Sequence, residues 1–186
     1  MNPYETCPVI ENAHYMLRLI EPGDAADLFL VYSDPRAVPL FNADNCINSF
    51  YCTSPEQVRQ MIDFWLDEYR KKYYVRWTIL DKSTCQAIGT IELFNRQAED
   101  YFTDCGLLRL DLRSDYETSD RIIKILSLLL PQAFHLFGCR MIATKVPGSA
   151  AERKNAVESL GFAYSEEVLI GSHNGTVYGD YYVLHQ

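Results

Sequence analysis

The chain has 186 residues, which is long enough to bury a hydrophobic core, so we expect a single domain over residues 1–186. Its 25 acidic residues outnumber its 17 lysines and arginines, and the formal net charge is −8 at pH 7. This charge opposes contacts with nucleic-acid phosphates and anionic membranes, so we expect neither as a partner. The six cysteines form no CxxC pair and no Cys/His cluster, so no metal site is indicated.

The N-terminus and the longest apolar stretch indicate a protein that is neither secreted nor anchored in a membrane. Residues 1–9 contain Glu5 and Pro8 and lack a basic segment followed by an apolar run, so no secretory signal is expected. Residues 122–137 are apolar, but polar side chains such as Lys124 interrupt them and they are too few to span a bilayer. We therefore expect a cytoplasmic protein in which this stretch is a buried helix.

The N-terminal part of the chain predicts one strand and two helices. Residues 15–20 are typical of a strand, which stops at a Glu-Pro-Gly-Asp turn. Apolar side chains then recur at three- and four-residue steps over residues 25–32 and predict a helix that ends before Pro35. Ser54 is followed by proline and glutamate, a pattern typical of a helix N-terminus, so a second helix is predicted from there to Arg70.

The rest of the chain predicts strands and helices in a mixed order. Three antiparallel strands are predicted first, over residues 73–80, 87–94 and 104–112. A helix, a strand and a second helix are predicted next, over residues 122–137, 140–146 and 151–160. Asn174-Gly175 favours a type I′ turn, so residues 168–170 and 177–184 predict a closing hairpin.

Short motifs follow one another along this order of elements. They are Leu17-Arg18-Leu19, Ile88-Gly89-Thr90-Ile91, Gln132-Ala133-Phe134, Glu158-Ser159-Leu160-Gly161-Phe162 and Gly179-Asp180-Tyr181. Their order and spacing resemble the GNAT superfamily of N-acetyltransferases, specifically the branch of ribosomal-protein N-terminal acetyltransferases. The resemblance implies an α/β (α+β) fold with a mixed, mostly antiparallel sheet of about seven strands, splayed between its fourth and fifth strands and flanked by about four helices.

The resemblance also implies an activity and a cofactor. The activity is transfer of an acetyl group from acetyl-CoA to a primary amine, of a peptide N-terminus or a small molecule, by direct attack. In this family the pantetheine arm pairs with the backbone of the fourth strand, here at Leu110, Asp111 and Leu112. The pyrophosphate binds a glycine-containing loop at the N-terminus of the next helix, where the helix dipole favours anions.

The loop before that helix departs from the family pattern, which is Gln or Arg, two residues, Gly, one residue, then Gly or Ala. Glu117, Asp120 and Ile122 stand at the three defined positions, and two carboxylates there would repel a pyrophosphate. Arg113 and Arg121 could compensate as donors. Alternatively, Ser119 or Asp120 caps the helix without any ligand. The candidate cofactor-binding residues are Leu110, Leu112, Arg113, Glu117, Thr118, Ser119, Asp120, Arg121, Ile122 and Arg153.

The helix predicted over residues 151–160 departs from the family as well. Ala150 stands where the family has a pantetheine-binding asparagine, and Arg153 stands where it has a serine. Val157 stands where many members have a tyrosine that acts as the acid protonating the departing thiolate. These departures leave a second hypothesis open. The chain could be an inactive member of the fold that binds another ligand or a protein partner, and a homodimer is possible in either case.

Two acids inside the predicted sheet, Glu92 and Asp111, are the candidates for a general base. If either faces the cleft, burial would raise its pKa and suit it to accept a proton from an amine. Alternatively, both lie on a solvated sheet face and pair with Arg109 or another base. Aromatic residues are predicted either to line the acceptor pocket or to pack in the core; they are Phe41, Phe50, Tyr51, Tyr73 and Tyr74.

Overall fold

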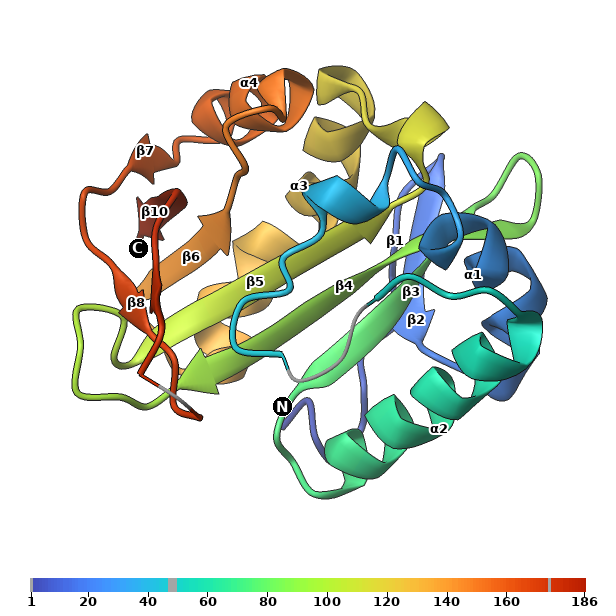
Figure 1. Ribbon diagram of the computed structural model, residues 1–186, viewed down its shortest axis with the longest axis horizontal. Coiled ribbons are helices and arrows are strands. Elements are labelled where there is room, and N and C mark those ends of the chain that lie inside the picture. The colour runs from blue at the N-terminus through green and yellow to red at the C-terminus, as the bar shows by residue number, and fades with distance from the viewer. Residues whose placement is uncertain (1, 47–49, 174) are drawn as a thin grey trace.

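A mixed eight-stranded sheet forms the centre of the computed structural model, which describes residues 2–46, 50–173 and 175–186 (Figure 1). Neighbouring strands pair antiparallel, apart from the parallel pair β5 and β6. In spatial order the strands are β1 (Ile10–Glu11), β2 (Tyr15–Leu19), β3 (Val75–Asp81), β4 (Gln86–Arg96), β5 (Cys105–Leu112), β6 (Met141–Lys145), β10 (Tyr181–His185) and β7 (Ala163–Tyr164). The predicted fold class is confirmed, and the sheet ends at both edges in strands of two residues.

Helices cover both faces of this sheet. In Figure 1, α1 (Ala25–Tyr32) and α2 (Pro55–Arg70) lie in front of it, and α3 (Ser119–Phe137) lies behind it. The fourth helix, α4 (Ala151–Ser159), packs against α3. Short 3-10 turns occupy Pro22–Asp24, Val38–Leu40 and Ser114–Tyr116. Within the described residues, no helix has the length and apolar character needed to cross a membrane.

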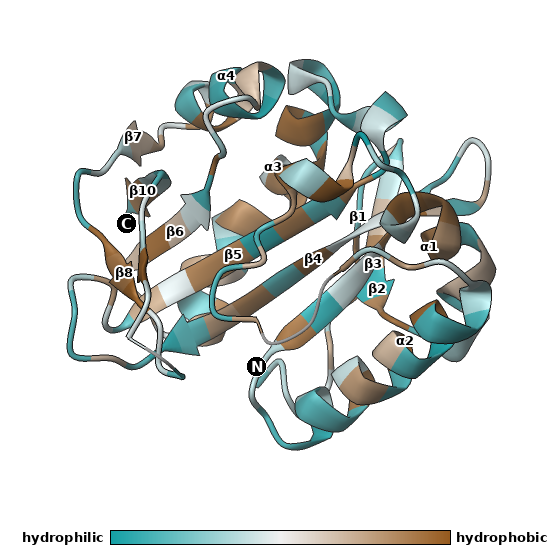
Figure 2. Cartoon of the chain, viewed as in Figure 1, coloured by the Kyte–Doolittle hydropathy of each residue, from teal (hydrophilic) through white to brown (hydrophobic). Residues whose placement is uncertain are grey.

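Helix α2 forms where its sequence predicts it. The Oγ atom of Ser54 accepts a hydrogen bond from the N–H of Gln57 at 3.3 Å, which caps the first turn. Val58, Ile62 and Trp65 follow at helical spacing and are buried, and polar side chains occupy the outward face, as the mixed colours of α2 in Figure 2 show. The helix is therefore held to the sheet by one apolar stripe.

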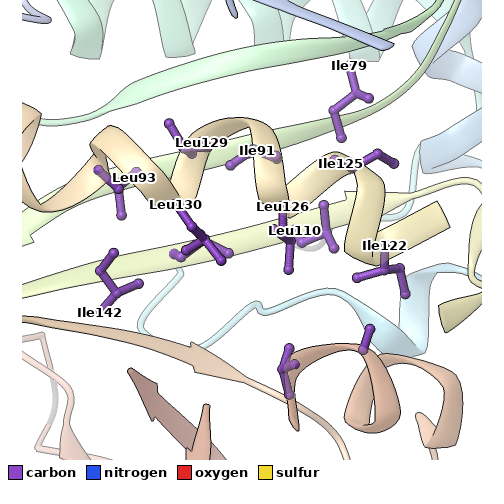
Figure 3. Close-up of a cluster of buried hydrophobic side chains, with 14 of the residues drawn as sticks. Ile79, Ile91, Leu93, Leu110, Ile122, Ile125, Leu126, Leu129, Leu130 and Ile142 are labelled. Carbon is purple, nitrogen blue, oxygen red and sulfur yellow. The ribbon is translucent and has the colours of Figure 1, made fainter. Parts of the chain in front are cut away.

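Helix α3 is anchored by a longer apolar stripe. Its side chains from Ile122 to Leu130 pack against strand residues that include Ile91, Leu110 and Ile142 (Figure 3). Because burial of each large aliphatic side chain contributes about 1.5–3 kcal/mol, this contact fixes the helix firmly on the sheet. It thereby fixes the loop between β5 and α3, where the cofactor site is predicted.

The closing hairpin is confirmed, but its details differ from the prediction. Strand β8 (Leu169–Ile170) pairs with β9 (Val177–Tyr178), and the N–H of Gly171 donates to the carbonyl of Thr176 at 2.8 Å. The predicted two-residue turn is therefore wrong, and Asn174 itself lies outside the described residues. The predicted strand over residues 177–184 is two strands, because Asp180 has a left-handed φ of 65° that interrupts extended backbone before β10.

A Gly89→Ala variant is expected to lose about 1–3 kcal/mol of unfolding free energy. A Cβ atom at Gly89 would overlap the carbonyl oxygen of Asp111 on the neighbouring strand β5, and backbone cannot move aside as a flexible side chain can. Gly148→Ala is the matched control, because nothing lies within 4 Å of a Cβ atom there. Urea unfolding measures both variants, and equal losses would contradict the proposed clash.

Candidate active site

Strands β5 and β6 separate near the middle of the sheet. Their parallel pairing runs from Cys105 opposite Met141 to Leu108 opposite Thr144 and then ends, although β5 continues to Leu112. Over these last residues β5 still pairs with β4 on its other side. One backbone edge of β5 is thus left without a strand partner, at the place where the resemblance predicts the splay.

The side chain of Arg153, from the first turn of α4, lies on this edge. It is only 2% exposed, and its Nη1 atom donates to the carbonyl of Leu110 at 2.9 Å and to the carbonyl of Leu40 at 2.8 Å. Its Nε and Nη2 atoms bind the carboxylate of Glu117 in bidentate fashion. Burial raises the pKa of Glu117, although Arg153 opposes that rise. The two candidate cofactor residues therefore form a buried ion pair.

The N-terminus of α3 is also engaged by α4. Thr118 is the N-cap residue and its side chain makes no capping hydrogen bond, whereas the N–H of Ser119 donates to Oε2 of Glu152 at 2.7 Å. The prediction that Ser119 or Asp120 caps the helix is wrong, because a carboxylate from another helix takes that role. Glu152 was not predicted as a site residue, because an acidic residue in the first turn of a helix ordinarily indicates an interaction with the dipole of its own helix.

The other charged residues of the loop point away from the β5 edge. The side chain of Asp120 is 74% exposed and binds Lys124 at 2.7 Å. Arg113 binds Asp115 at 2.6 Å, and Arg121 donates to the carbonyl of Asp115 at 2.6 Å. Arg121 also lines a separate cavity of about 310 Å³ near the turn between β3 and β4. Of the loop acids, Glu117 rather than Asp120 is the one held at the edge.

The remaining cofactor candidates contribute backbone and core rather than polar side chains. Leu110, Leu112 and Ile122 have buried side chains that pack between the sheet and α3. Because the side chains of Leu110 and Leu112 are buried, the main chain of β5 is the part of these two residues that is available at the splay.

A cleft of about 1030 Å³ lies next to this edge, bounded by β4, β5, the end of α2 and the β8 segment. Glu92 borders the cleft, and Asp111 is not among its lining residues. Tyr73 and Tyr74, two of the predicted aromatic residues, line this cleft. The lining residues Glu68 and Phe94 were missed, although Phe94 stands two residues after Glu92 and thus on the same face of β4.

The other predicted aromatic residues lie elsewhere. Phe41 and Phe50 are buried in a core cluster beneath α1 and α2, where their rings contact Tyr32. Tyr51 is half exposed and is not among the residues that line the cleft. The core interpretation therefore holds for Phe41 and Phe50.

Glu92 belongs to a buried network of charges centred on Arg76. The guanidinium of Arg76 binds Glu92 at 2.5 Å and Asp111 at 3.0 Å, and Arg109 binds the other oxygen of Glu92 at 2.9 Å. Tyr32 completes the network with a hydrogen bond to Asp111. The expected pairing with Arg109 is correct for Glu92, but the expected solvated face is wrong, because these groups are buried.

The network sets the protonation of Glu92. Burial pushes its pKa upward, but the charges and hydrogen bonds of Arg76 and Arg109 outweigh burial, and the pKa lies below its ordinary value. The expectation that the pKa of this acid lies above its ordinary value is therefore wrong, because the two arginines outweigh burial. Glu92 is ionised at neutral pH and carries a negative charge to the wall of the cleft.

The comparisons with known proteins agree with this architecture. The family model of the acetyltransferase (GNAT) domain matches residues 14–163, so the chain belongs to the GNAT acetyltransferase family. No curated protein matches the sequence significantly.

Solved structures with the same fold include ribosomal-protein acetyltransferases. RimJ of Mycobacterium smegmatis, in complex with CoA-disulfide, has a TM-score of 0.73 and 12% identity, covering 100% of this chain and 90% of that one. RimL, a ribosomal L7/L12 α-N-protein acetyltransferase in complex with coenzyme A, has a TM-score of 0.70 and 13% identity, with coverages of 96% and 98%. The ribosomal-protein-S5-alanine acetyltransferase of Vibrio fischeri has a TM-score of 0.68 and 17% identity, with coverages of 95% and 94%. At these identities the likeness shows a shared fold alone.

The backbone of this site fits acetyl-CoA, the cofactor that the family implies. The carbonyl of Leu110 lies on an edge that an extended arm can join, and the N–H of Ser119 already binds a carboxylate, which shows that it can hold an anionic oxygen. Both groups are bound by side chains of the same chain, Arg153 and Glu152. The groups that would hold the cofactor are thus present, and each has an internal partner.

Proposed function

We propose that this protein is an acyl-CoA-dependent N-acetyltransferase whose acceptor is a primary amine, of a peptide N-terminus or a small molecule. The observation that carries the proposal is the continuity of strand β5. Arg109 of this strand lines the large cleft, and the next residue, Leu110, presents its carbonyl at the splayed edge. An acceptor in the cleft and an acyl donor on the edge would therefore meet at one strand. When bound, acetyl-CoA supplies an acetyl group activated as a thioester.

The side chains of the cleft suit an amine. Among the described residues, five carboxylates and two arginines line the cleft, and this excess of negative charge attracts a cationic acceptor. Tyr73, Tyr74 and Phe94 add aromatic surface, against which an amine or the apolar part of its carrier can pack. Glu92 is the proposed general base, because it is the one of the two candidate acids that borders the cleft. It would take the proton that the amine loses on direct attack.

A second function is favoured by a different observation. Arg153 and Glu117 fill the edge on which the cofactor would lie, and they satisfy each other there. A protein that never binds acetyl-CoA would have this arrangement and could still use the neighbouring cleft. The second candidate is therefore a non-catalytic member of the family that binds an amine-bearing ligand or peptide.

Incubation with acetyl-CoA and a set of peptides and small amines is expected to add one acetyl group to primary amines. Mass spectrometry of the acceptors detects the product, and peptides with blocked N-termini and no lysine are the matched control. Direct attack further predicts that the protein itself gains no acetyl group when incubated with acetyl-CoA alone. If no amine is acetylated and calorimetry detects no binding of acetyl-CoA, the second candidate replaces the first.

A further inference from the structure

The first turn of α4 contacts both halves of the predicted cofactor site. Glu152 reaches the N-terminus of α3, and the adjacent Arg153 reaches the open edge of β5. The first contact lies where a pyrophosphate would bind, and the second where a pantetheine arm would pair with the strand. The consecutive side chains of Glu152 and Arg153 thus bind a main-chain N–H group at the helix N-terminus and a main-chain carbonyl at the strand edge, the two kinds of group that would hold the cofactor.

The carbonyls of Leu40 and Leu110 and the carboxylate of Glu117 form a complete set of acceptors for Arg153, which we call its seat. The guanidinium donates to two main-chain carbonyls, of Leu40 and Leu110, and it forms a bidentate pair with Glu117. A buried ion pair is tolerated only when hydrogen bonds replace the lost solvation, and Arg153 is not among the described residues with unsatisfied buried atoms. The planar fork of arginine matches this set of acceptors, whereas lysine could not satisfy all of them.

The acceptors that form the seat of Arg153 come from three different segments of the chain. Leu40 belongs to the segment between α1 and α2, Leu110 to the edge of β5, and Glu117 to the loop before α3. Arg153 reaches all three segments from α4. Its side chain therefore crosses the space between the turn that contains Leu40 and strand β5 of the sheet. An extended ligand on the β5 edge would need that space as well as the carbonyl of Leu110.

We propose that Arg153, with Glu117 and Glu152, is an internal plug of the cofactor site, and that acetyl-CoA binds only when Arg153 leaves the carbonyl of Leu110. This inference rests on the proposed function, because it concerns the same site. Affinity for the cofactor is then set by a competition within the chain. Glu152 occupies the anion position of α3 and Arg153 the strand edge, so each side chain competes with a different part of the cofactor.

The test is a Glu117→Gln/Arg153→Ser double variant. It removes both members of the buried pair, so neither charge is left alone, and it installs residue types that the family has at these two positions. Lys154→Ser/Glu158→Gln is the matched control, because it removes a half-exposed ion pair from the same helix with the same change in net charge. An Arg153→Lys variant keeps a cation for Glu117 but loses the fork, and it tests the plug without emptying the seat.

Calorimetric titration of acetyl-CoA measures the affinity of each protein, and thermal unfolding checks that each is folded. The Glu117→Gln/Arg153→Ser variant is expected to bind about tenfold or more tightly than the parent, Arg153→Lys to be intermediate, and Lys154→Ser/Glu158→Gln to match the parent. Equal, tight binding by parent and double variant would overturn the plug and leave the proposed function standing. If neither the parent nor the folded double variant binds acetyl-CoA, the plug is overturned and acetyl-CoA is also removed from the proposed function.

Discussion

A Glu92→Gln variant is expected to acetylate its amine acceptor about a hundredfold more slowly than the parent, at the lower end of what a positioned general base contributes. The side chain keeps its shape but can no longer accept a proton at the wall of the cleft. The effect stays at that lower end because Arg76 and Arg109 hold the pKa of Glu92 below its ordinary value, which makes it a weaker base. The ratio kcat/KM, measured with one primary amine, reports the change.

Asp111→Asn is the matched control for this variant. Asp111 shares Arg76 with Glu92, so each substitution removes one carboxylate from the same buried network. Only Glu92 borders the cleft. Similar losses of stability with a loss of rate confined to Glu92→Gln would support the proposed base. Equal losses of rate in both variants would show that Glu92 acts through folding alone.

The lowered pKa of Glu92 also fixes the direction of its pH dependence. The ionised carboxylate is the form that accepts a proton, and it is fully present above 4.5, the ordinary pKa of a glutamate. The rate is therefore expected to lose the contribution of Glu92 only as the pH falls through the lowered value. Its contribution to stability has the same sign, because a depressed folded-state pKa stabilises the fold above the ordinary value and is lost in acid.

Arg76→Met is expected to destabilise the fold by about 3–5 kcal/mol, the usual result of removing one partner from a buried ion pair. The carboxylates of Glu92 and Asp111 would lose the cation that lies between them. The stacking of the guanidinium on Trp65, at 4.2 Å from the ring centroid, would be lost as well. Denaturant unfolding measures the change. Arg59→Met, at an exposed position of α2, is the control and should change stability by less than about 1 kcal/mol.

A double variant, Arg76→Met with Asp111→Asn, separates charge from packing. Glu92 keeps its pair with Arg109 and no carboxylate is left without a cation, so the double variant is expected to recover part of the stability lost by Arg76→Met. If the single variant is as stable as the Arg59→Met control, the network does not stabilise the fold in the proposed way.

The elements that could be predicted from the sequence are those with strong local signals. Helix α2 has a cap at Ser54 and a regular apolar stripe, and neither depends on distant residues. The two-residue strand β7 has no such signal, because its pairing with β10 near the end of the chain creates it. The Asn-Gly motif correctly indicated a hairpin, but the left-handed Asp180 divided the following strand.

The site could be predicted in part for a similar reason. The departures at Glu117 and Arg153 are visible in the sequence, but their contact joins segments 36 residues apart and depends on tertiary structure. The charged network around Glu92 could be predicted more readily from the sequence. Arg76 and Arg109 stand directly opposite Glu92 on the two neighbouring strands, so the strand registers alone place the three together. The isolated Arg76 in an apolar strand was the signal.

The two-residue strands at the sheet edges affect how copies of the chain can associate. A long free edge offers a row of unpaired N–H and C=O groups on which another chain can grow, and this leads to aggregation. Strands β1 and β7 offer only short templates of that kind. A second copy would gain few backbone hydrogen bonds there, so the homodimer that the sequence leaves open would have to be built from side chains, and the sheet is a poor seed for fibrils.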